Sequence, residues 1–170
     1  ELSERANWSP IMSHFWQDED ENWWLKVFGK SRKLRDITVP IDFLPFLERY
    51  RTSRGLLGLP ASNENSILVE KIRGQGGMTS RHLRRLVQAV FDQAYENMRQ
   101  AEGANKALKL KEASSHWLRH TGASMEIERG RALKDLSEDL GHSSMATTDT
   151  IYVQTENKVR AESGKHRKVN

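Results

Sequence analysis

The sequence predicts an α+β domain that is mostly α-helical, with a small antiparallel β-hairpin at one edge. Two runs rich in aromatic and β-branched residues flank the segment Gly-Lys-Ser-Arg-Lys at 29–33, which is typical of a hairpin. After residue 80, apolar residues recur at intervals of three and four, the period of an amphipathic helix. A length of 170 residues fits one domain and is too short for two of full size.

The hairpin is assigned to residues 22–40, with strands in 22–28 and 34–40. Pro40 ends the second strand because proline cannot donate a hydrogen bond within a sheet. The next apolar residues follow helical spacing and predict a short helix, in which Pro45 is tolerable only in the first turn. These apolar residues are Phe43, Phe46, Leu47 and Tyr50.

Two loops and a long helix are expected next. Segments 55–66 and 74–80 are rich in Gly, Asn and Ser and predict loops, with a short strand between them at 67–71. A long helix then starts after Thr79 or Ser80. Its apolar stripe consists of Leu83, Leu86, Val87, Val90, Phe91, Ala94 and Met98.

The C-terminal third predicts three further helices. The first covers 114–130, capped by Ser114 or Ser115 and stopped by Gly130. Gly141 ends the second, at 133–141, and the third covers 143–152. The basic stretch 156–170 is polar and is expected to form a tail.

Composition excludes several classes of protein. The chain has no cysteine, which excludes a disulfide scaffold, a zinc ribbon, an iron–sulfur site and a thiol nucleophile. No apolar run approaches the roughly 18 residues of a membrane helix, and the start has no secretory signal. The expected location is therefore the cytoplasm, at the nucleoid. Because residue 1 is not Met, we expect a piece of a longer protein.

The charge pattern suggests a polyanionic partner, with nucleic acid as the leading candidate. The net charge is +4, and basic residues cluster at 29–35, 81–85 and 164–168. Arg81, Arg84 and Arg85 begin the long helix, where cations oppose the helix dipole and an anionic partner would remove that cost. On charge alone, ordinary solvated faces explain these clusters equally well.

The residues that could carry chemistry gather in the C-terminal third. His116 and Arg119 share a helix face, His142 follows Gly141, and Tyr152 lies ten residues beyond His142. Phosphoryl transfer on a diester needs a nucleophile, a proton donor and fixed positive donors, and a tyrosine can form the covalent intermediate. Taken singly, each residue also has an ordinary reading: a polar helix face, a helix cap or a core aromatic.

A metal site is the alternative use of the histidines. His116 and His120 have the i, i+4 spacing of a two-histidine zinc face, and His142 could complete three ligands. However, no Glu lies between them as in zinc proteases, and Arg119 would repel a dication. We therefore expect neither metal nor cofactor.

The order of these motifs resembles the tyrosine recombinase (phage integrase) family. HWLRHTGAS at 116–124 is similar to its H-x-x-R-H box, LSEDLGHSS at 136–144 to its L-G-H-S box, and IYVQ at 151–154 to its tyrosine box. Arg119 and His142 are 23 residues apart, an interval similar to that of the family. The segment VFGKSRKLRDITVP resembles the family's hairpin, whose turn carries a lysine directly after a glycine, here Lys30.

The resemblance implies the helical catalytic domain of a DNA recombinase over residues 1–155. Tyr152 would attack the scissile phosphate, Lys30 would protonate the leaving 5′ oxygen, and His116 would assist proton transfer at the phenol. Arg119 and His142 would hold the non-bridging oxygens. The implied partners are double-stranded DNA and other protomers of the same recombinase, as a tetramer on paired sites. The expected DNA contacts, mostly to phosphates, are Lys33, Arg35, Arg81, Arg84 and Arg85.

The sequence departs from the family pattern in two places. The family's other active-site arginine would fall just before Glu1, so we expect weak cleavage by residues 1–170. Tyr152 lies one residue farther from His142 than in the commonest pattern, but Tyr50 and Tyr95 sit in apolar helix patterns. Two other hypotheses remain: a DNA-binding relative that does not cut, and a histidine-metal hydrolase.

Overall fold

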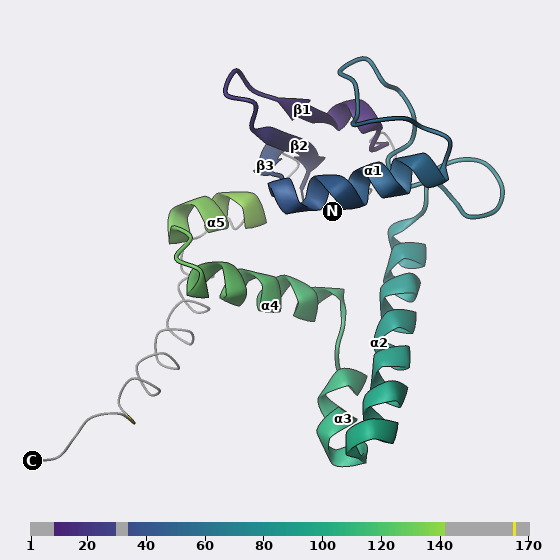
Figure 1. Cartoon of the computed structure of the whole chain (residues 1–170), viewed down its shortest axis with the longest axis vertical. Coiled ribbons are helices and arrows are strands. Elements are labelled where there is room, and N and C mark those ends of the chain that lie inside the picture. The colour runs from purple at the N-terminus through teal and green to yellow at the C-terminus, as the bar shows by residue number, and fades with distance from the viewer. Residues whose placement is uncertain (1–8, 30–33, 142–164, 166–170) are drawn as a thin grey trace, which may run out of the picture. The chain divides into compact units, whose positions relative to one another are not determined.

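The computed structural model describes residues 9–29, 34–141 and 165 (Figure 1). The chain divides into two compact units, an N-terminal unit up to Ser80 and a C-terminal unit from Arg81 onward. Together they confirm the predicted class, which is mostly helical with a small antiparallel sheet.

The N-terminal unit contains a three-stranded antiparallel sheet in the order β1-β2-β3. Its strands are β1 (Phe15–Gln17), β2 (Trp23–Phe28) and β3 (Leu34–Thr38). The predicted hairpin is β2 and β3, which pair from Trp24 with Thr38 to Phe28 with Leu34. Strand β1 was not predicted, because its three residues run directly into an acidic segment.

That acidic segment is the turn between β1 and β2. The Asp18 carboxylate accepts the backbone N–H groups of Asp20 and Asn22 at 3.0 and 2.9 Å, and the Trp24 indole N–H at 2.8 Å. These bonds hold the pKa of Asp18 below its usual value, and the bond from Trp24 has the largest effect. The cluster of acidic residues is therefore a hydrogen-bonded turn, since aspartate side chains readily pair with the backbone just after them.

The core of the N-terminal unit lies between the sheet and helix α1. Helix α1 (Leu44–Ser53) follows a 3-10 turn at Ile41–Phe43 and has Pro45 in its first turn, as predicted. The segment predicted as a strand at 67–71 is not one, because only the isolated bridges Ile11–Ile67 and Glu70–Gly77 form there. The buried core residues are Met12, Phe15, Leu47 and Leu68.

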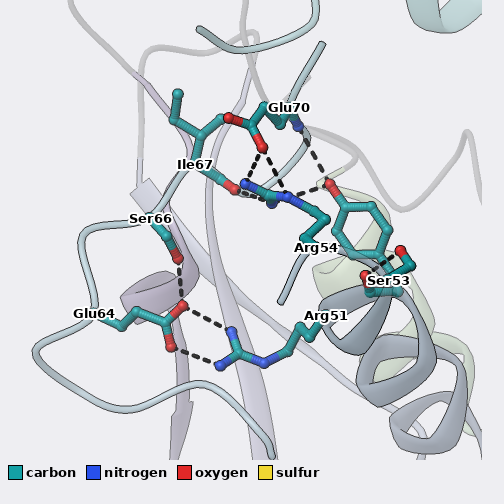
Figure 2. A network of polar contacts seen from close by, with 8 residues as sticks. Arg51, Ser53, Arg54, Glu64, Ser66, Ile67 and Glu70 are labelled. Atoms are coloured by element: carbon teal, nitrogen blue, oxygen red, sulfur yellow. Dashed lines mark hydrogen bonds and ion pairs between the residues drawn. The ribbon is translucent and has the colours of Figure 1, made fainter. Parts of the chain in front are cut away.

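A network of two arginines ties the long loop after α1 back to that helix (Figure 2). Arg51 is only 2% exposed; it donates to both Glu64 carboxylate oxygens at 2.9 and 2.8 Å and to the Gly58 carbonyl at 2.6 Å. Arg54 donates to Glu70 at 2.6 Å and to the Ile67 carbonyl at 2.7 Å. The buried guanidinium lowers the pKa of Glu64 to about 2.

The C-terminal unit is helical. Its helices are α2 (Ser80–Glu102), α3 (Ala104–Lys111), α4 (Ser115–Glu128) and α5 (Leu133–Leu140). Helix α3 was not predicted; it follows α2 directly after Gly103, whose φ is 91° (Figure 1). The Lys111 ammonium lies 4.9 Å from the centre of the Tyr95 ring of α2. Within the described ranges, no helix is long and apolar enough to span a bilayer. The helix predicted at 143–152 and the tail at 156–170 lie outside those ranges, apart from residue 165.

The long helix begins at Ser80, as predicted, but little of its apolar stripe is buried. Within the part of the chain that the structure describes, Phe91 is the only buried residue of the stripe, whereas Val90 is 69% exposed. Phe91 meets Trp117 of α4 edge to face, with ring centroids 6.0 Å apart. This contact joins α2 to the helix that carries the histidine–arginine box.

Candidate functional site

The candidate site is built on α4, whose first turn is fixed by Ser114. The Ser114 hydroxyl accepts the backbone N–H of Trp117 at 3.3 Å, which confirms it as the cap. This bond satisfies one of the N–H groups that the first turn of a helix leaves unpaired. His116, Arg119 and His120 follow at positions i, i+3 and i+4 and therefore share one face of α4.

The two histidines on this face are bonded to each other. Their Nε2 atoms are 2.8 Å apart, their ring centroids are 4.4 Å apart, and their planes are nearly perpendicular. Within residues 9–29, 34–141 and 165, no three histidine or carboxylate side chains are arranged to hold a metal ion. His142, the third ligand of the metal hypothesis, lies outside the described residues.

Arg119 connects this face of α4 to the end of α5. Its Nη2 donates to the carbonyl oxygen of Leu140, the last residue of α5. The carbonyls in the last turn of a helix lack partners within that helix, and the helix dipole makes this end attractive to cations. The Arg119 guanidinium therefore both pairs with a free carbonyl of α5 and brings a positive charge to its negative end. The next residue, Gly141, takes the left-handed conformation with a φ of 64°, which ends the helix as predicted.

Two further contacts hold α4 against α5. Ala123 and Leu136 are each 3% exposed and pack together as a small core. Arg131, in the connection between the helices, forms an ion pair with Asp139 and lies 3.7 Å from Glu126. Together with the Arg119 bond, these contacts fix the turn that leads into His142 relative to the His116 face.

The basic cluster at the start of α2 has the exposure that binding an anion requires. Arg81, Arg84 and Arg85 are exposed and lie at i, i+3 and i+4, on one face of the helix. They are in the first turns, where the helix dipole favours a bound anion over a cation.

The hairpin residues belong to the N-terminal unit. Lys30 and Lys33 lie outside the described residues, between Gly29 and Leu34. Arg35 pairs with buried Val27 across the ladder and is half-buried, and its guanidinium lies so close to Gly29 that it would have to shift to make room for a β-carbon there. The absence of a side chain at Gly29 therefore lets Arg35 fold back over the start of the turn.

A known family matches most of the chain. The sequence model of the Phage integrase family matches residues 13–158, a span that includes the hairpin, the H-x-x-R-H box, the L-G-H-S box and Tyr152. The chain belongs to the phage integrase family, the tyrosine recombinases.

This integrase-family chain has both a curated relative and solved structural neighbours. Tyrosine recombinase XerC of Corynebacterium glutamicum is 31% identical over 79% of this chain and 37% of its own length. The XerH site-specific recombinase bound to palindromic difH substrate, in a post-cleavage complex, has a TM-score of 0.60 at 18% identity over 91% of this chain and 39% of its own. The XerH pre-cleavage complex with difH substrate has a TM-score of 0.55 at 19% identity over 84% and 36%. This integrase chain thus spans less than two fifths of the length of each of these proteins.

The sequence located the integrase boxes but missed three contacts that organise them. These are the bond from Arg119 to the Leu140 carbonyl, the ion pair between Arg131 and Asp139, and the bond between the rings of His116 and His120. Of the three, only the bond between His116 and His120 has a signal in the sequence, which is their i, i+4 spacing. That spacing is also the one expected for two histidines that bind zinc. Tyr152, like His142, lies outside the described residues.

Proposed function

We propose that this chain is the catalytic domain of a site-specific DNA recombinase, which cuts and rejoins DNA strands through a 3′-phosphotyrosyl intermediate. The observation that carries the proposal is the bond from Arg119 to the Leu140 carbonyl. It joins the H-x-x-R-H helix to Leu140, the first residue of the L-G-H-S box, which supports a common site for the two boxes. Membership of the phage integrase family supports the same conclusion.

In the proposed reaction Tyr152 is the nucleophile. Its phenolic oxygen attacks the scissile phosphorus and displaces the 5′ oxygen, which Lys30 protonates as it leaves. A flexible lysine ammonium is suited to this transfer because it carries three rotatable donors. The tyrosine ester conserves the energy of the phosphodiester, so the rejoining step needs neither ATP nor a metal ion.

The transition state carries extra negative charge on the non-bridging oxygens. Arg119 has a planar fork of donors that matches two such oxygens, and its bond to Leu140 fixes the plane of that fork. His142, two residues beyond Leu140, donates to the same oxygens. His116, on the same helix face as Arg119, takes the proton from the phenol.

The proposed partner is double-stranded DNA, bound mainly through its phosphates. The exposed face formed by Arg81, Arg84 and Arg85 supports this, as do the DNA-bound complexes of the structural neighbour XerH. Lys33 and Arg35 of the hairpin would add further phosphate contacts. Assembly as a tetramer on two paired sites and a location at the nucleoid are also part of the proposal.

The test is a covalent-adduct assay on a nicked suicide substrate, from which the cleaved end diffuses away. The recombination site is first recovered by selecting bound duplexes from random-sequence DNA. The assay is run with residues 1–170 and with a chain extended upstream, because the family resemblance assigns a second arginine to the position before Glu1. Each is compared with Tyr152→Phe, in the presence and absence of EDTA.

The three hypotheses give different results in this assay. A recombinase forms an adduct that resists EDTA and disappears in Tyr152→Phe. A DNA-binding relative that does not cut binds the site in a salt-dependent manner and forms no adduct in either chain. A histidine-metal hydrolase loses its activity in EDTA. Either of the last two results would overturn the proposal.

A further inference from the structure

The bond between His116 and His120 imposes a chemical condition on both rings. With the two Nε2 atoms 2.8 Å apart, one must carry hydrogen and the other must offer its lone pair. Two neutral rings can therefore pair only as opposite tautomers. In the part of the chain that the structure describes, each ring has the other as its hydrogen-bond partner, and both side chains are exposed.

We propose that His120 is a positioning residue for His116, an inference that rests on the proposed function. The Nε2 lone pair of His120 accepts the Nε2–H of His116, so that His120 carries its own hydrogen on Nδ1. His116 is then left with one basic atom, Nδ1. This is the arrangement in which a second group sets the tautomer of a catalytic histidine and leaves its other nitrogen to exchange the proton.

The proton balance of the cleavage step follows from this pairing. The Tyr152 O–H proton moves to Nδ1 of His116 as the O–P bond forms, while the bond from phosphorus to the 5′ oxygen breaks and Lys30 supplies that oxygen's proton. His116 becomes an imidazolium whose Nε2–H still points to the lone pair of His120. On rejoining, Nδ1 returns the proton to the phenolic oxygen and Lys30 recovers its own.

The opposite pairing would give His116 a different role. If His120 donated to Nε2 of His116, the hydrogen of His116 would lie on Nδ1, and the ring could donate to the phenol but could not accept its proton. The tautomers of the two rings therefore distinguish the alternatives, and they can be measured without DNA.

The first experiment reads both tautomers by long-range ¹H–¹⁵N NMR on the chain labelled at its histidine ring nitrogens. It is recorded near pH 8, because the test concerns the two neutral tautomers of each ring. His116→Phe and His120→Phe assign the signals. We expect the hydrogen on Nδ1 in His120 and on Nε2 in His116. The reverse distribution, or the same tautomer for both rings, would overturn the inference.

The second experiment measures the rate of adduct formation in the assay described above. His120→Phe keeps an aromatic ring but removes the acceptor, and we expect the rate to fall by about 10- to 100-fold, the range found when a metal-binding histidine loses its orienting partner. His120→Gln restores an acceptor oxygen and should recover part of that loss. Met125→Leu, on the opposite side of α4 and 44% exposed, is the matched control and should retain the wild-type rate.

The outcomes separate this inference from the proposed function. An adduct in the wild type that is lost in Tyr152→Phe but formed at the wild-type rate by His120→Phe would overturn the role of His120 alone. No adduct in the wild type, in either the short or the extended chain, would overturn the proposed function and this role with it. Equal losses in His120→Gln and His120→Phe, with unchanged tautomers in His116, would indicate a merely structural role and would also overturn the inference.

Discussion

The Arg119 guanidinium donates to the carbonyl oxygen of Leu140, 21 residues away in the sequence, and so joins α4 to the last turn of α5. Gly141 follows in the left-handed conformation and directs the chain toward His142. The arginine that is proposed to bind the scissile phosphate thus also contacts the end of α5, one residue before Gly141 and two before His142, for which a phosphate contact is likewise proposed.

Arg119→Lys keeps the positive charge but loses the planar fork. We expect DNA binding to change little and adduct formation to fall by about 10²–10³-fold, because the bidentate hold on the non-bridging oxygens is lost in the transition state. The measurement is single-turnover adduct formation at saturating protein. Arg129→Lys, at an exposed position of the same unit, is the control. A rate within twofold of the wild type for Arg119→Lys would remove Arg119 from the mechanism.

Gly141→Ala places a β-carbon on a residue whose φ is 64°. We expect the free energy of unfolding to fall by about 1 kcal/mol, because L-residues other than glycine are strained there. Gly141→Asn should cost less, since asparagine tolerates the left-handed conformation. Urea denaturation of the three chains checks the order. Equal stability for glycine and alanine would show that this turn is not left-handed in solution.

Replacing one arginine of the α2 face should change the salt dependence of DNA binding. For Arg84→Gln or Arg85→Gln, we expect the slope of log affinity against log salt concentration to fall by about 1, because one phosphate contact is lost. Arg99→Gln is the matched control, since Arg99 lies at the other end of α2 in an ion pair with Glu96. If all three substitutions gave the same slope as the wild type, this face would not contact DNA.

The network of Arg51 and Glu64 should make the stability of the fold depend on pH. The pKa of Glu64 falls from an ordinary 4.5 to about 2 on folding, so its contribution is complete above about pH 4.5 and is lost as the pH falls towards 2. At pH 7 we expect Glu64→Gln to lower the free energy of unfolding by about 3 kcal/mol, because it leaves the buried Arg51 charge without its partner.

Urea denaturation between pH 2 and pH 7 tests this expectation. The difference between the wild type and Glu64→Gln should shrink as Glu64 is protonated in the folded protein. Glu70→Gln is the control, because the Glu70 side chain is 43% exposed and its ion pair with Arg54 should contribute only about 0–1 kcal/mol. A difference that stays constant over the whole pH range would contradict the assigned role of Glu64.

Local patterns were sufficient for the elements that carry their own signals. Two runs rich in aromatic and β-branched residues predicted β2 and β3, and the capping residues Ser114 and Gly141 predicted the start of α4 and the end of α5. Strand β1 and helix α3 are short and lack such signals. The segment 67–71 has the composition of a strand but forms only isolated bridges, because tertiary contacts decide pairing over so few residues.

The candidate site divides in the same way. Spacing alone placed His116 and Arg119 on one helix face, and the order of the boxes indicated the family that the comparison confirms. The bond from Arg119 to Leu140 could not be predicted, because it depends on how α4 and α5 pack through Ala123 and Leu136. The roles of Lys30, His142 and Tyr152 stay predictions.

The most direct measurement is to locate the covalent bond between protein and DNA. The adduct formed on the suicide substrate is digested with protease and nuclease, and the peptide that carries the nucleotide is sequenced by mass spectrometry. The account predicts a single modified residue, Tyr152, bonded to a 3′-phosphate. A nucleotide attached to Tyr50, to Tyr95 or to any residue other than Tyr152 would contradict it.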